Sequence, residues 1–172
     1  MDDVSKGSIP GMQLCRALPT YYLTTDSRND RGVTTVSELE DLMKQSNLRM
    51  IGVARQAQIT ASMLKSTETV VDVVKAYRVL VDGKKLGHGS GSALVFLTNE
   101  RLIVACGDSH TIPLGDIVST TDLVKGKFSW ATGDGRTWSF EHARGVIRSD
   151  GNQTNTARFY GRFEEQVGSC RE

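Results

Sequence analysis

Few side chains in this sequence have a type and spacing that would carry chemistry. His88, His110 and His142 are the three histidines, and no two of them have the i, i+2 or i, i+4 spacing of a metal site. Cys106 lies four residues before His110, which suggests a thiol with a neighbouring base. However, Cys106 ends an apolar run, so we expect it in the core, where a thiol is inert. We predict no catalytic residue, no metal and no cofactor.

The glycine-rich segment 82–92 (DGKKLGHGSGS) invites an interpretation as a phosphate cradle. It lacks the P-loop pattern and no helix is expected after it, so a hairpin loop is the better interpretation. The alternative is an anion site to which Lys84, Lys85 and His88 contribute. Arg101 is the fourth candidate for ligand binding. Its structural alternative is an ion pair that ties down a neighbouring loop or Asp116.

Composition and charge exclude several classes of function. The 172 residues are enough for one domain, or for one domain with a helical appendage. Twenty-one Lys and Arg against 20 Asp and Glu give a net charge of +1, which argues against nucleic-acid binding. Three scattered cysteines without a C-x-x-C pair indicate a reducing compartment. No apolar run reaches the ~20 residues of a membrane span, and no secretory signal is visible, so we expect a cytoplasmic protein.

The first third of the chain is expected to be an arm followed by two helices. Residues 1–32 are mostly polar, and we interpret them as an extended or partly disordered arm. Thr35 and Glu38 fit a capping box at the start of a helix that ends near Gln45. A second helix is expected over Leu48–Leu64. Together they predict an α-helical hairpin over 33–65.

The remainder is expected to be a small β domain. From Thr69 the apolar period changes to 2, which predicts a strand over Thr69–Val81. Asn99-Glu100 and Asp134-Gly135 predict two tight hairpins. The further strands are expected at Ala93–Thr98, Arg101–Cys106, His110–Pro113, Ile117–Val124, Lys127–Ala131 and Arg136–Glu141.

The helical period returns near residue 155. The apolar face is expected to consist of Ala157, Tyr160, Phe163 and Val167, with Gly168 as the stop. These elements predict an α+β, mainly β fold. It is a bent antiparallel barrel of six to seven strands over 66–168, capped by the C-terminal helix and followed by a tail at 169–172.

Five apolar residues are candidates for partner binding. Leu39, Leu42 and Met43 lie on one face of the first predicted helix. Trp130 and Trp138 lie at near-symmetric positions of the Asp134-Gly135 hairpin. A cross-strand aromatic pair is favoured there over a platform for a ligand.

Two runs of residues resemble bacterial pleckstrin-homology-like (PH-like) and GRAM-type domains. They are Ala93–Val104, which contains Leu97-Thr98-Asn99-Glu100-Arg101-Leu102, and His110–Ile117, which contains Ile112-Pro113-Leu114. The resemblance covers about 66–168. It implies a seven-strand bent sheet capped by a helix and used to bind phospholipid headgroups or peptides, or to self-assemble. Members that bind phosphoinositides carry basic residues in the loop after the first strand, where this chain has Lys84, Lys85 and His88.

We therefore expect a non-enzymatic binding module that contacts another protein, including copies of itself. Exposed sheet edges commonly pair with one another, and this chain has no cluster of cations beyond Lys84-Lys85 to hold a membrane. One alternative is peripheral binding to an anionic membrane surface through Lys84 and Lys85. Another is a regulatory or phage-type inhibitor that grips a cellular partner with the helical hairpin.

Overall fold

The computed structural model describes residues 35–46, 48, 53–86, 93–106, 108–141 and 150–171. The predicted arm (1–32), His88 and His142 lie outside this part of the chain. The described helices are α1 (Val36–Gln45), α2 (Val53–Met63) and α3 (Asp150–Ser169), with a short 3-10 helix η1 (Leu114–Asp116).

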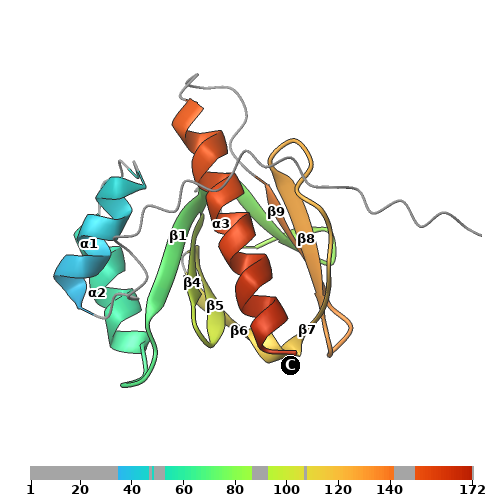
Figure 1. Cartoon of the computed structure of the whole chain (residues 1–172), viewed down its shortest axis with the longest axis horizontal. Helices are drawn as coiled ribbons and strands as arrows, with labels where there is room; N and C mark the ends of the chain where they lie inside the picture. The colour runs from blue at the N-terminus through green and yellow to red at the C-terminus, as the bar shows by residue number, and fades with distance from the viewer. Residues whose placement is uncertain are drawn as a thin grey trace, which may run out of the picture.

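The described strands form two antiparallel sheets, and α3 lies across them (Figure 1). The first sheet has the strand order β1 (Val70–Ala76), β4 (Ala93–Thr98), β5 (Arg101–Cys106) and β6 (Asp108–Pro113). The second has the order β3 (Lys84–Lys85), β2 (Arg78–Val81), β9 (Thr137–Glu141), β8 (Lys127–Thr132) and β7 (Ile117–Thr120). The predicted α+β architecture is confirmed.

The described residues contain nine strand segments, where six to seven strands were expected. The predicted strand Thr69–Val81 bends at Tyr77, so β1 belongs to the first sheet and β2 to the second. The Tyr77 N–H donates to the carbonyl of Glu141 at 2.8 Å, which ties the bend to β9. One run of chain therefore joins the two sheets.

Local turn signals place several hairpins. Leu97 pairs with Leu102, which confirms the two-residue turn at Asn99-Glu100. The prediction that segment 82–92 is a loop throughout is wrong, because Asp82-Gly83 is a tight turn and β3 follows it. Both turn residues have a left-handed backbone, with φ of 51° and 76°, as a two-residue hairpin with a right-handed strand twist requires.

A second turn of this kind shortens another predicted strand. Lys125 and Gly126 have φ of 52° and 73°. The strand expected over Ile117–Val124 ends at Thr120, and Val124 is left in a single bridge to Lys127 across the turn.

The inner core lies between the two sheets and α3. From α3 it receives Phe159, Phe163 and Val167, and Phe163 packs on Phe128 and Trp130 at ring-centroid distances of 5.5 and 5.7 Å. The predicted apolar face of this helix is wrong only at Ala157, which is half-buried, because Tyr160 packs against the inner core with its ring centroid 5.2 Å from that of Phe128. The predicted stop is also wrong, because Gly168 is helical.

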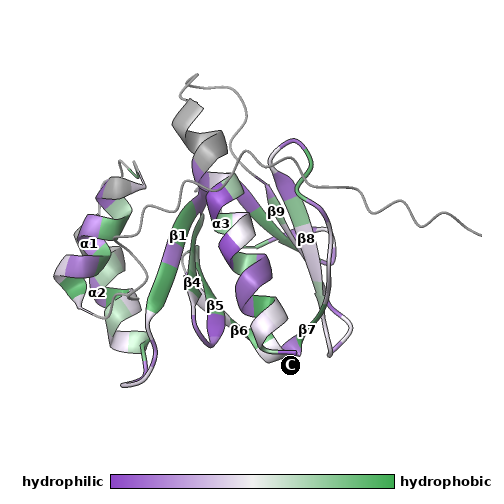
Figure 2. Ribbon diagram, viewed as in Figure 1, coloured by the Kyte–Doolittle hydropathy of each residue, from purple (hydrophilic) through white to green (hydrophobic). Residues whose placement is uncertain are grey.

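The helical hairpin α1–α2 covers the outer side of β1, β4 and β5, while the outward residues of β6, namely Ser109, Thr111 and Pro113, are exposed. Its capping box is confirmed, with the Glu38 N–H 3.3 Å from Thr35 Oγ1 and the Thr35 N–H 3.0 Å from Glu38 Oε2. The outer core beneath it combines hairpin and sheet residues: Leu39, Leu42, Met43, Leu48, Ala57, Val70, Val73, Leu94, Phe96, Ile103 and Ala105. All six residues of β4 are buried as a result. Figure 2 shows the apolar character of β1 and β4 beside the hairpin.

The second sheet is buried on one face only. In β8, the residues Phe128, Trp130 and Thr132 are buried, whereas the alternate residues Lys127, Ser129 and Ala131 are exposed or half-buried. β9 alternates in the same way. Among the described residues no helix contributes to a core on its outer side.

We expect the hairpin to be required for the β domain to fold. A fragment of residues 65–172 exposes the apolar outer face of the first sheet, including Phe96 and Ile103, and we expect it to aggregate and to bind a hydrophobic dye. The measurement is dye fluorescence together with thermal unfolding. The control is a fragment of residues 35–172, which keeps both helices. A 65–172 fragment as stable and as soluble as this control would contradict the expectation.

Candidate functional site

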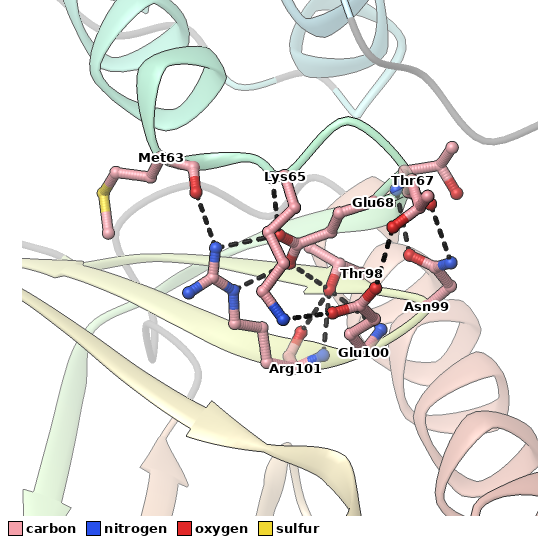
Figure 3. A network of polar contacts seen from close by, with 9 residues as sticks. Met63, Lys65, Thr67, Glu68, Thr98, Asn99, Glu100 and Arg101 are labelled. Atoms are coloured by element: carbon pink, nitrogen blue, oxygen red, sulfur yellow. Dashed lines mark hydrogen bonds and ion pairs between the residues drawn. The ribbon is translucent and has the colours of Figure 1, made fainter.

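Arg101 forms a buried ion pair and does not face an open ligand site. Its Nε and Nη2 atoms lie 2.8 Å from Oε1 and Oε2 of Glu68, respectively. Nη2 also donates to the carbonyl of Met63, the last residue of α2, at 2.6 Å. Figure 3 shows the Arg101 guanidinium beside the carbonyl of Met63 and the carboxylate of Glu68. The expectation that Arg101 binds a ligand is corrected. It ties down the segment between α2 and β1, and Glu68 takes the place of the expected Asp116.

Glu68 is satisfied from three sides. Its side chain has 0% exposure. The Thr98 hydroxyl donates to Oε1 at 2.8 Å, and the Lys65 N–H donates to Oε2 at 3.1 Å. Burial on its own raises the pKa of Glu68, but the hydrogen bonds from Arg101, Lys65 and Thr98 outweigh it and hold that pKa below its usual value. Thr98 and Arg101 of the Leu-Thr-x-x-Arg-Leu run therefore hold the end of the hairpin and the segment after it against the first sheet.

Asp72 is a second buried carboxylate, also with 0% exposure. Arg158 of α3 binds both of its oxygens, with Nη2–Oδ1 at 2.7 Å and Nε–Oδ2 at 2.9 Å. Arg158 Nη2 also donates to Ser46 Oγ at 3.0 Å, and Asn155 donates to the Ser46 carbonyl at 2.8 Å. These contacts join β1 and α3 to the residue that ends α1.

The same region protects the edge of the first sheet. β1 is an edge strand, and Arg162 Nη1 donates to the carbonyl of Val71 at 3.0 Å while lying 3.6 Å from Asp72 Oδ2. A β-bulge between Val70 and Asp72 interrupts the alternation of side chains there. Arg158 and Arg162 are thus committed to Asp72 and β1.

Tyr160 of α3 and Arg171, which follows the helix, form hydrogen bonds to β7 and the segment after it. The Tyr160 hydroxyl donates to the carbonyl of Thr121 at 3.2 Å, and Arg171 Nη2 donates to the carbonyl of Ile117 at 3.0 Å. Burial, with the negative charges of Glu164 and Asp122, raises the pKa of Tyr160 to about 12. Tyr160 therefore stays protonated and keeps its role as a donor at neutral pH.

The predicted partner-binding residues lie inside the chain. Leu39, Leu42 and Met43 are buried in the outer core, and Trp130 and Trp138 in the inner core. The two tryptophans face each other in register, as predicted, with ring centroids 6.2 Å apart and planes within 5°. None of the five presents a surface to a partner, so the expectation is corrected. Apolar spacing identified core positions that the chain itself covers.

Lys84 and Lys85 are both exposed on the edge strand β3, while His88 is not described. Carboxylates lie on the two neighbouring turns. Asp82 Oδ1 accepts the Thr137 N–H at 2.8 Å, and Asp134 pairs with Arg136 at 3.3 Å. The charges of this end of the barrel are therefore mixed.

No described helix covers the outer side of the second sheet. We call it the open face and define it by its outward residues: Arg78, Leu80, Lys85, Lys127, Ser129, Ser139 and Glu141. Glu141 lies between Arg78 and Lys127 on neighbouring strands and pairs with both. The hydrogen bond from Lys127, together with Arg78, holds the pKa of Glu141 below its usual value in spite of burial.

Three apolar side chains stand at the margin of the open face. Tyr77, Val118 and Val124 are 51%, 59% and 60% exposed, and no other large hydrophobic residue of the described chain is exposed. The Arg78 guanidinium lies 5.6 Å from the centre of the Tyr77 ring, within cation–π range. This surface was not among those predicted from the sequence. Its signal was the alternation of Phe128 and Trp130 with Lys127 and Ser129.

Cys106 and His110 do not form a nucleophilic pair. Burial, with the charge of Asp108, raises the pKa of the Cys106 thiol. The ring of His110 packs against that of Trp138, with ring centroids 6.5 Å apart. Within the described ranges, no group of three His, Cys, Asp or Glu side chains converges on a possible metal position. The described helices include none long and apolar enough to span a membrane.

No protein-family model and no curated protein matches this sequence. Among solved structures, the Vps36 N-terminal PH domain is similar, with a TM-score of 0.48 and 12% identity over 62% of this chain and 84% of that one. Two antiparallel sheets joined by a bent strand, with a C-terminal helix packed across them, define the architecture. This arrangement agrees with the bent antiparallel sheets and the C-terminal capping helix expected from the sequence.

The Glu68–Arg101 pair predicts acid sensitivity of this domain. Because the pKa of Glu68 is lower in the folded than in the unfolded chain, its stabilising effect is present above about pH 4.3 and is lost as the pH falls further. Glu68→Gln leaves Arg101 without its anion, and we expect a loss of about 3 kcal/mol at pH 7. Urea unfolding between pH 3 and 7 measures both, and the variant should lose less stability than the parent below pH 4.3. Parallel profiles would contradict this role.

The Asp72–Arg158 pair predicts a similar penalty at the junction of α1, β1 and α3. Arg158→Met leaves a buried carboxylate with the Val73 N–H and the more distant Arg162, and we expect a loss of about 3 kcal/mol. Arg158→Lys should recover part of it, since a lysine cannot bind both oxygens. Arg136→Met, at an exposed pair, is the control and should cost under about 1 kcal/mol. Equal losses for Arg158→Met and Arg136→Met in urea unfolding would exclude this role.

Proposed function

We propose that this chain is a non-enzymatic protein-binding module and that the open face is its binding surface. The observation that carries the proposal is the difference between the two sheets. The hairpin covers the outer side of β1, β4 and β5 in the first sheet, whereas β8 and β9 of the second sheet are buried on one side only. Tyrosine and arginine are enriched at protein interfaces, and Tyr77 and Arg78 lie together on this side of the domain, 5.6 Å from ring centre to guanidinium.

The charges favour a protein over a membrane. Recruitment to an anionic membrane gains about 1 kcal/mol for each nearby Lys or Arg, so it requires a cluster of cations. On the open face, Glu141 neutralises part of the charge of Arg78 and Lys127. Beside Lys84 and Lys85, the turns carry Asp82 and Asp134.

The test of the proposal compares the proteins that copurify from source cells with two variants of the full chain. Tyr77→Ser/Val124→Ser removes two exposed apolar groups of the open face, and we expect it to lose a partner present at a near-stoichiometric amount. The matched control is Gln58→Ser/Ser66→Ala, on exposed positions of the hairpin side, and it should keep that partner. Identical partners for both variants would overturn the assignment of the open face.

A second candidate is peripheral binding to anionic lipid, favoured by two adjacent exposed lysines on β3. Sedimentation with phosphatidylserine vesicles at low and high salt tests it. Salt-sensitive binding that Lys84→Ala/Lys85→Ala abolishes would support a membrane role, and binding unaffected by these changes would exclude this site.

A further inference from the structure

The outward side of α1 carries excess negative charge. Leu39, Leu42 and Met43 are buried in the outer core and Val36 packs against it, whereas Glu38, Asp41 and Lys44 are exposed and Glu40 is half-buried. These positions carry three carboxylates against one lysine, and Lys44 lies 3.0 Å from Asp41. The acidic surface of α1 is defined by Glu38, Glu40, Asp41 and Lys44.

The open face has the opposite excess. Its outward residues include the cations Arg78, Lys85 and Lys127 and the carboxylate Glu141, and Asp82 lies on the turn beside Lys85. Glu141 is largely covered by its two cationic neighbours, whereas the side chains of Arg78 and Lys127 are nearly half exposed. A docking surface therefore presents cations outward, with Tyr77 and Val124 beside them.

The two surfaces lie on opposite sides of the domain. The hairpin covers the outer side of β1, β4 and β5 in the first sheet, and the open face is the outer side of the second sheet. In Figure 1, α1 and α2 stand at one flank and β8 and β9 at the other. One copy therefore has no means of bringing its own α1 to its open face while the hairpin stays docked.

We propose that the acidic surface of α1 in one copy docks on the open face of a second copy. This inference rests on the proposed function and names its partner as the chain itself. The charges are complementary, and burial of Tyr77 and Val124 supplies the apolar area that charges at an interface rarely provide. Because the two surfaces differ, the contact is heterologous. Repetition of such a contact builds an open chain of subunits or, where the rotation closes, a ring.

The experiment is light scattering of the full chain over a range of concentrations at low and high salt. We expect assemblies larger than a dimer at low salt, and high salt should weaken them because it screens exposed charges. Glu40→Lys/Asp41→Lys places cations opposite cations, and Tyr77→Ser/Val124→Ser removes the apolar contacts. Each change should raise the concentration needed for assembly by about tenfold or more. Gln58→Lys/Ser66→Lys adds the same lysines elsewhere on the hairpin side and should assemble like the parent.

Mixing the two variants gives the decisive result. The first keeps an intact open face and the second keeps an intact α1, so an equal mixture should form dimers and nothing larger. A mixture that stays monomeric, or assembly that persists in either variant alone, would overturn the inference. A parent chain that is monomeric at all concentrations would also overturn it. In that case, loss of a copurifying protein on Tyr77→Ser/Val124→Ser would leave the proposed function standing, and retention would remove both.

Discussion

The carboxylate of Asp72 has no exposed surface and is held by a guanidinium from a helix 86 positions further along the chain. Water can no longer solvate this charge, so the folded state is acceptable only while Arg158 reaches it. That requirement fixes the distance of α3 from β1, and through Ser46 it also fixes the end of α1. The position of the hairpin and the protection of the β1 edge follow from the same contact.

Glu68 applies the same constraint at the opposite end of the hairpin. Thr98 and Arg101 flank the β4–β5 turn, and both donate hydrogen bonds to Glu68. Arg101 also donates to the carbonyl of Met63 at the end of α2. An arginine that satisfies a carboxylate and a helix-terminal carbonyl compensates two groups that would be costly to bury alone. The hairpin is therefore fastened by a buried acid at each end, with an apolar core between them.

Local signals predicted much of the fold. Thr35 and Glu38, Asn99-Glu100 and Asp134-Gly135 each act within a few residues, so their outcome depends little on the rest of the chain. The pairs Asp72–Arg158 and Glu68–Arg101 link distant positions, and no spacing rule predicts them. The all-apolar run Ala93–Leu97 also contained information about how the first sheet is packed. A strand without alternation is buried on both faces, so an outer cover was implied.

The candidate site was the harder part to predict. Arg101, Leu39, Leu42 and Met43 have the residue types of binding surfaces, yet each is used within the chain. Spacing identifies which residues share a face but does not tell whether another element of the chain covers it. The open face was accessible to the same alternation argument, because Lys127 and Ser129 interrupt a run of large aromatic residues.

The bend at Tyr77 has a consequence for the cooperativity of the domain. Because β1 and β2 are consecutive, neither sheet can lose its contribution from this run without disturbing the hydrogen bonds of the other. Opening fluctuations that begin in one sheet therefore propagate into its neighbour. In a sandwich whose two sheets are linked only by surface loops, no continuous strand passes from one sheet to the other. The two sheets are then able to fray separately.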